Sequence, residues 1–92
     1  MTSPKSKAAA APLTAKQLRS TLRRKCWTED EYHDFEKEGW YITFRNYDSR
    51  VCIQAYGRRG DDDERFNSGW QYINDCQLSG RTLRIAGVEV RL

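Results

Sequence analysis

The spacing of apolar side chains changes at Gly39, and this change limits the possible folds more than any other feature of the sequence. Before Gly39, apolar residues recur at helical spacing. After it, Trp40, Ile42 and Phe44 alternate with more polar residues, as on a half-buried strand. Helical segments followed by a run of strands are typical of an α+β fold. We therefore expect an α+β fold with two N-terminal helices packed on a four- to five-stranded antiparallel sheet.

The first expected helix begins at a capping box. Thr14 is followed three residues later by Gln17, so each side chain is placed to accept a hydrogen bond from the backbone N–H of the other residue. Leu18, Leu22 and Cys26 then fall on one face of the helix. These features predict a helix from about Thr14 to Cys26.

The same signature recurs immediately afterwards, with Thr28 as the cap and Glu31 three residues later. Gly39 suits the position just beyond a helix C-terminus, where a left-handed backbone conformation is common. We therefore predict a second, acidic helix from about Glu29 to Glu38, with Tyr32 on its buried face.

The remainder of the chain has the pattern of strands separated by turns. Turn-forming residues occupy positions 46–49, 79–80 and 86–87, and a long polar loop covers 57–68. Between them we expect strands at residues 40–45, 50–56, 70–78, 82–85 and 88–92. The first two of these strands should form an antiparallel hairpin.

The first twelve residues contain almost no large apolar side chain, so ordering them would cost entropy without compensating burial. We expect residues 1–12 to be a flexible tail and residues 13–92 to form a single α+β domain. No apolar run approaches the roughly 20 residues that a membrane span needs, and no secretory signal is recognisable. We expect a soluble, cytoplasmic protein with no membrane contact.

Charge is strongly segregated along the chain. The first 25 residues carry seven basic residues and no acid, whereas residues 29–38 carry six acids against Lys37 alone. One explanation is a pair of solvated surfaces that keep a small domain soluble. Because the first helix has no acid of its own, we favour a functional explanation for its basic face.

Basic side chains near one another are suited to contacts with nucleic-acid phosphates. Our candidates for this role are Lys16, Arg19, Arg23, Arg24, Lys25, Arg58 and Arg59, with Lys5 and Lys7 on the tail. Tyrosines at positions 41, 47, 56 and 72 would stack bases if one face of the sheet exposed them; the alternative is that they pack in the core.

The acidic residues suggest a different contact, in which carboxylates meet basic side chains of a partner protein. Our candidates are Glu29, Asp30, Glu31, Asp34, Glu36 and Glu38 in the second helix, and Asp61, Asp62, Asp63 and Glu64 in the polar loop. The alternative is a solvated helix face and loop tip.

Catalytic and metal-binding patterns are weak in this sequence. His33 is its single histidine, and Cys26, Cys52 and Cys76 are too widely spaced to preform a zinc site. We expect the cysteines to be reduced and mostly buried. We therefore predict a binding protein rather than an enzyme, with no metal, cofactor or small-molecule substrate.

A short α+β chain without catalytic residues and with segregated charge resembles the small inhibitors that phages encode against host defence, in particular anti-CRISPR proteins acting on type I-F surveillance complexes. The resemblance implies stoichiometric docking on a ribonucleoprotein of Cas proteins and guide RNA, which would block target DNA or nuclease recruitment. The alternatives are a small RNA- or DNA-binding module or phage regulator that acts directly on nucleic acid, and a subunit of a larger assembly.

Overall fold

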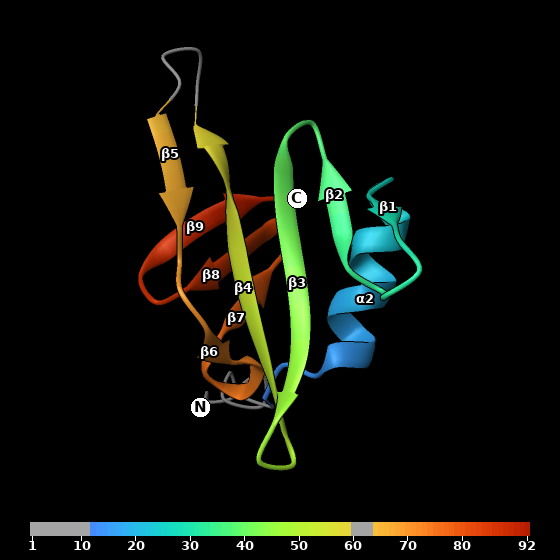
Figure 1. Ribbon diagram of the computed structural model, residues 1–92, viewed down its shortest axis with the longest axis vertical. Helices are drawn as coiled ribbons and strands as arrows, with labels where there is room; N and C mark the ends of the chain where they lie inside the picture. Colours follow the sequence, from blue (N-terminus) through green and yellow to red (C-terminus); the bar gives the residue numbers. More distant parts are fainter. Residues whose placement is uncertain (1–11, 60–63) are drawn as a thin grey trace, which may run out of the picture.

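The computed structural model describes residues 12–59 and 64–92. This part of the chain contains one α-helix, a short 3-10 helix and nine strands in two antiparallel sheets (Figure 1). The predicted fold class, two N-terminal helices on a single sheet, is therefore wrong. The protein is mostly β, and the second predicted helix is replaced by strands.

Helix α2 (Ala15–Arg24) precedes the larger sheet. That sheet has the strand order β1 (Thr28–Glu29), β2 (Phe35–Lys37), β3 (Trp40–Tyr47), β4 (Arg50–Arg59) and β5 (Glu64–Asn67), and β6 (Gln71–Tyr72) also pairs with β4. The 3-10 helix η1 (Ile73–Asp75) leads into the smaller sheet of β7 (Gln77–Ser79), β8 (Thr82–Ile85) and β9 (Val88–Arg91).

The predicted capping box at the start of α2 is confirmed. Gln17 N donates to Thr14 Oγ1 at 3.2 Å, and Thr14 N donates to Gln17 Oε1 at 3.1 Å. The helix ends where Cys26 adopts a left-handed conformation (φ 69°) and Trp27 N donates to Leu22 O at 3.0 Å. This turn leaves Cys26 exposed, which corrects its predicted place on the buried face.

The predicted helix from Glu29 to Glu38 is wrong, because this segment forms the β1–β2 hairpin. The Asp30 carboxylate accepts hydrogen bonds from the backbone N–H of Tyr32 (2.8 Å) and Asp34 (2.9 Å). A short aspartate side chain that bonds to nearby backbone competes with helix formation and closes a turn instead. Tyr32, predicted to be buried, is 70% exposed.

Two-residue turns close the hairpins that flank β3. Glu38 and Gly39 have φ of 52° and 88°, and Asp48 and Ser49 have φ of 55° and 67°. Two consecutive positive φ values favour tight hairpins because their twist matches that of the strands. Gly39 therefore belongs to a hairpin turn and not to a helix terminus.

The strand predictions are largely confirmed, with two corrections. The β3–β4 and β8–β9 hairpins form as expected. The predicted polar loop at 57–68 is shorter, because β4 continues to Arg59 and β5 begins at Glu64. The predicted strand at 70–78 is broken by η1 into β6 and β7.

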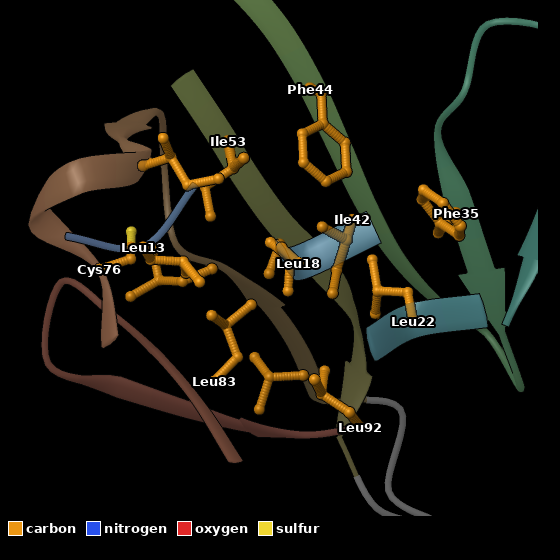
Figure 2. Close-up of a cluster of buried hydrophobic side chains, with 14 of the residues drawn as sticks. Leu13, Leu18, Leu22, Phe35, Ile42, Phe44, Ile53, Cys76, Leu83 and Leu92 are labelled. Carbon is orange, nitrogen blue, oxygen red and sulfur yellow. The ribbon is translucent and has the colours of Figure 1, made fainter. Parts of the chain in front are cut away.

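The hydrophobic core lies between one face of the larger sheet, helix α2 and the smaller sheet (Figure 2). Leu18 from α2, Ile42 from β3, Ile53 from β4 and Leu83 from β8 are each fully buried. Burial of large aliphatic side chains is the main favourable contribution to folding. We call this packed side of the larger sheet its inner side.

Candidate functional site

The outer side of the larger sheet carries exposed aromatic side chains. Along β3, Ile42 and Phe44 point into the core, whereas Tyr41 and Tyr47 alternate with them and are 40% and 65% exposed. Successive strand residues point to opposite faces, so the strand divides its aromatic residues between the two sides of the sheet.

Cross-strand pairing extends the outer side over β4 and β6. Tyr41 lies opposite Tyr56, and their rings stack with centroids 5.2 Å apart and 13° between the ring planes. Farther along, Arg45 lies opposite Cys52, which in turn lies opposite Tyr72. Because directly paired residues project to the same face, these side chains share one surface.

Part of this surface is a hollow of about 590 Å³, a volume in the range of ligand pockets. Its lining includes Trp70, which is 45% exposed, and Tyr72, together with Arg45, Asn46 and Tyr47. We call this space the aromatic hollow. We use the name aromatic face for Tyr41, Tyr47, Tyr56, Trp70 and Tyr72 together.

Two arginines lie against these rings. The Cζ atom of Arg50 is 3.6 Å from the centroid of the Tyr72 ring, and that of Arg45 is 5.8 Å from the Trp70 ring. Arg45 is also paired with the Asp34 carboxylate at 3.2 Å. Arg50 makes no ion pair within residues 12–59 and 64–92.

The basic side chains of α2 are mostly apart from the aromatic face, because the helix packs on the inner side of the sheet. Arg23 donates from Nε and Nη2 to the Glu29 carboxylate at 2.8 and 3.1 Å, which compensates its charge. Arg24 bonds to a threonine of its own helix. Lys16 and Lys25 also belong to the helix and its C-cap.

Arg19 is the exception among the helical candidates. Its Cζ atom lies 4.2 Å from the centroid of the Phe44 ring, and it lines a second hollow in common with Arg45. The structure therefore brings one predicted phosphate contact close to the edge of the aromatic hollow.

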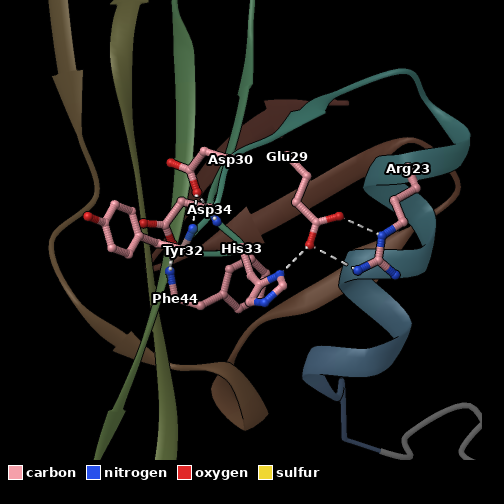
Figure 3. Close-up of polar contacts among 7 residues, drawn as sticks. All are labelled: Arg23, Glu29, Asp30, Tyr32, His33, Asp34 and Phe44. Atoms are coloured by element: carbon pink, nitrogen blue, oxygen red, sulfur yellow. Dashed lines mark hydrogen bonds and ion pairs between the residues drawn. The ribbon is translucent and has the colours of Figure 1, made fainter.

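Most of the acids of the predicted helix have partners within the protein (Figure 3). The Glu29 carboxylate accepts the Arg23 bonds and lies 2.8 Å from His33 Nδ1, and these contacts lower the pKa of Glu29 to about 2. Asp34 is buried and accepts from Phe44 N at 2.9 Å.

Two further acids of this set have hydrogen bonds to backbone. Asp30 closes the turn described above, and Glu36 Oε2 accepts from Gly39 N at 3.2 Å. Glu31 and Glu38 are exposed. Asp30 and Glu36 thus bond to the backbone of turns, whereas Glu29 pairs with a side chain of α2 and Asp34 bonds to the backbone of β3.

The remaining predicted contacts lie around the β4–β5 connection. Arg58 and Arg59 end β4, where they lie opposite Arg65 and Glu64 of β5. Asp61, Asp62 and Asp63 are outside the described residues, as is the predicted tail except for Pro12.

Sequence reasoning identified the four tyrosines of the aromatic face as possible base-stacking residues, but it missed Trp70, Arg45 and Arg50 as members of the same site. The signal was present in part, since alternation along β3 places Arg45 on the same side as Tyr41 and Tyr47. The arrangement of Trp70 against Arg45 depends on the β4–β6 pairing, which no local pattern specifies.

The cysteines and His33 do not assemble into a metal site. Cys52 and Cys76 are buried, and burial raises the pKa of the Cys76 thiol to about 11. Within the described ranges, no three histidine, cysteine or acidic residues are grouped so that they could hold a metal ion. The helix found there is also too short and too polar to cross a membrane.

Comparison with protein families, with curated proteins and with solved structures finds no match to this chain.

Proposed function

We propose that this protein binds single-stranded nucleic acid on its aromatic face, without catalysing a reaction. The observation that carries the proposal is the presence of five aromatic side chains on one side of a sheet with two arginines against them. Bases stack on exposed aromatic rings with about 1–3 kcal/mol each, and basic side chains hold the phosphates between them.

A single strand suits this surface better than a duplex does. Stacking on Trp70 or Tyr47 requires an unpaired base that is free to leave its neighbours. Among the described residues, the outer side of the sheet presents no helix that could enter a groove. Arg45 and Arg50 beside the rings also favour an anionic ligand and disfavour a quaternary ammonium group, which aromatic residues would otherwise attract.

The resemblance to anti-CRISPR inhibitors adds a narrower proposal, in which the strand belongs to a ribonucleoprotein of Cas proteins and guide RNA in the bacterial cytoplasm. The stacking surface supports contact with exposed RNA or DNA of such a complex. The acidic residues lend this narrower proposal less support, because Glu29, Asp30, Asp34 and Glu36 have internal hydrogen-bonding roles.

The test is binding of fluorescent oligonucleotides, measured by anisotropy with the full chain. We expect a single strand of about twelve nucleotides to bind more tightly than a duplex of equal length. Trp70→Ala and Tyr72→Ala should each weaken binding by about 5- to 100-fold, whereas Tyr72→Phe, which retains the ring, should bind like the original protein. Equal affinity for the duplex, or unchanged binding by Trp70→Ala, would contradict the proposal.

Charge variants provide a second comparison. Arg50→Gln should weaken binding and reduce its salt dependence, whereas Arg91→Gln, an exposed position on β9 of the smaller sheet, should do neither. A third experiment concerns the ribonucleoprotein. Capture of the ribonucleoprotein by this protein should be lost in the Trp70→Ala variant, and it should also be lost after the complex is treated with nuclease. If the complex is still captured in both cases, the protein docks on the Cas proteins alone.

A further inference from the structure

A second hollow lies beside the aromatic hollow, between α2 and β3. Its volume is about 450 Å³, and its lining consists of Arg19, Tyr32, Phe44, Arg45, Asn46 and Val51. Arg45 and Asn46 line both hollows, so the two spaces adjoin at the edge of β3. We call the second space the Arg19 hollow.

Arg19 lies against an aromatic ring in this hollow, and no carboxylate of residues 12–59 or 64–92 pairs with it. Its Cζ atom lies 4.2 Å from the centroid of Phe44, and its Nε is buried without a hydrogen-bond partner in the described part of the chain. An unpaired buried donor is costly, so hydrogen bonding at Nε within the described residues does not account for this position of Arg19. The contrast with Arg23, which is paired with Glu29, is clear.

The charges around the hollow favour an anion. Arg19 and Arg45 contribute two positive charges, and the neighbouring Asp34 carboxylate compensates one of them through its contact with Arg45. Asp34 is further occupied by the backbone N–H of Phe44 at 2.9 Å. One positive charge therefore remains, carried by a planar guanidinium whose shape suits phosphate oxygens.

We infer that the Arg19 hollow binds the phosphate group next to the base that stacks in the aromatic hollow. This inference rests on the proposed function and adds the position of the strand on the surface. The base lies against Trp70 and Tyr72, and the adjoining phosphate lies against Arg19 and Asn46. The phosphate is either an internal linkage or a terminal monoester, which have the same chemistry at this site.

The test compares Arg19→Gln with Arg24→Gln, which removes the same charge from an exposed position of the same helix. Arg19→Gln should weaken binding of a single strand about tenfold and reduce the slope of log K against log salt by about 0.7, the value for one phosphate contact on a single strand. Arg24→Gln should change neither quantity. Arg19→Lys should keep much of the slope and lose part of the affinity.

Oligonucleotides distinguish the two sources of phosphate without altering the protein. A single uncharged methylphosphonate, moved along the strand, should weaken binding at one linkage if the phosphate is internal. Removal of the terminal phosphate should weaken binding if the bound phosphate is the terminal one. Either effect should vanish in Arg19→Gln. If Arg19→Gln binds like the original protein while Trp70→Ala does not, the inference fails and the proposed function stands. If no strand binds at all, both fail.

Discussion

The two sides of strand β3 differ in how far their large side chains are exposed to solvent. On the inner side, Ile42 and Phe44 are 0% and 5% exposed, whereas on the outer side Tyr41 and Tyr47 are 40% and 65% exposed. The same backbone thus supports a packed core and an open aromatic surface. Alternate residues of one strand are thus buried and exposed, so stability and the proposed ligand binding should respond separately to mutation.

The largest expected effect is on the inner side. Ile42→Ala should lower the free energy of unfolding by about 2–5 kcal/mol, because it removes a buried side chain and leaves a cavity. Its neighbour Tyr41→Ala should cost no more than about 1 kcal/mol, the order of one cross-strand pair. Urea denaturation followed by circular dichroism measures both. Similar losses for the two variants would mean that the outer side is also a structural core.

A smaller effect concerns the rim of the sheet, which belongs to neither side. Hydrogen bonds from Arg23 and His33 depress the pKa of Glu29 from 4.5 to about 2. A carboxyl group whose pKa is lower in the folded state stabilises the fold above its unfolded pKa, and this contribution is lost as pH falls through the folded value. Thermal unfolding should therefore reveal a difference between the original protein and Glu29→Gln at neutral pH.

That difference should shrink between about pH 4.5 and about pH 2. Glu36→Gln is the matched control, since Glu36 bonds only to backbone among the described residues. A Glu29→Gln difference that is independent of pH would indicate that the carboxylate charge is unimportant. Neither variant should change oligonucleotide binding, because Glu29 and Glu36 lie outside the aromatic face.

The smallest expected effect is at the end of α2, far from the outer side. Cys26 has φ of 69°, a conformation that costs a residue with a side chain about 1–2 kcal/mol and glycine very little. Cys26→Gly should therefore stabilise the protein by about 0.5 kcal/mol, after allowance for the greater entropy of glycine in the unfolded chain. Denaturation midpoints measure this change, and Cys26→Val should shift them in the opposite direction.

Local signals predicted the elements that depend on neighbours in sequence. The capping box of Thr14 and Gln17 marked the start of α2 correctly, and alternation from Trp40 marked β3. The Ala86–Gly87 turn was also predicted correctly, with φ of 50° and 82°. In each case the residues that form the feature lie within a few positions of one another.

The second predicted helix failed because two local signals competed. Thr28 and Glu31 had the same capping spacing as the first helix, but the Asp30 carboxylate bonds to the backbone of Tyr32 and Asp34 instead. Asp34 then bonds to Phe44 N on β3, a contact ten residues away. Pairing with β3 decides the outcome, and a pattern confined to the segment cannot contain that information.

The candidate site followed the same division. The tyrosines of the aromatic face were identifiable from their types and alternation, whereas the predicted phosphate contacts were chosen because they cluster in sequence. Arg45 and Arg50 do not cluster with other basic residues, and only strand pairing places them against Trp70 and Tyr72. Arg23 was predicted to contact phosphate because of its charge, but in the structure it is paired with Glu29.

The two-residue turn at Asp48–Ser49 has a consequence for the order of folding. The turn joins β3 and β4 directly, so this hairpin can close through contacts between residues that are near in sequence. The core also needs contacts between distant residues. For example, Asn74 Nδ2 donates to Leu13 O at 3.1 Å across 61 residues. Local contacts lose less chain entropy and tend to form sooner. We therefore expect the β3–β4 hairpin to form early, and the helix to dock on its inner side in a later step.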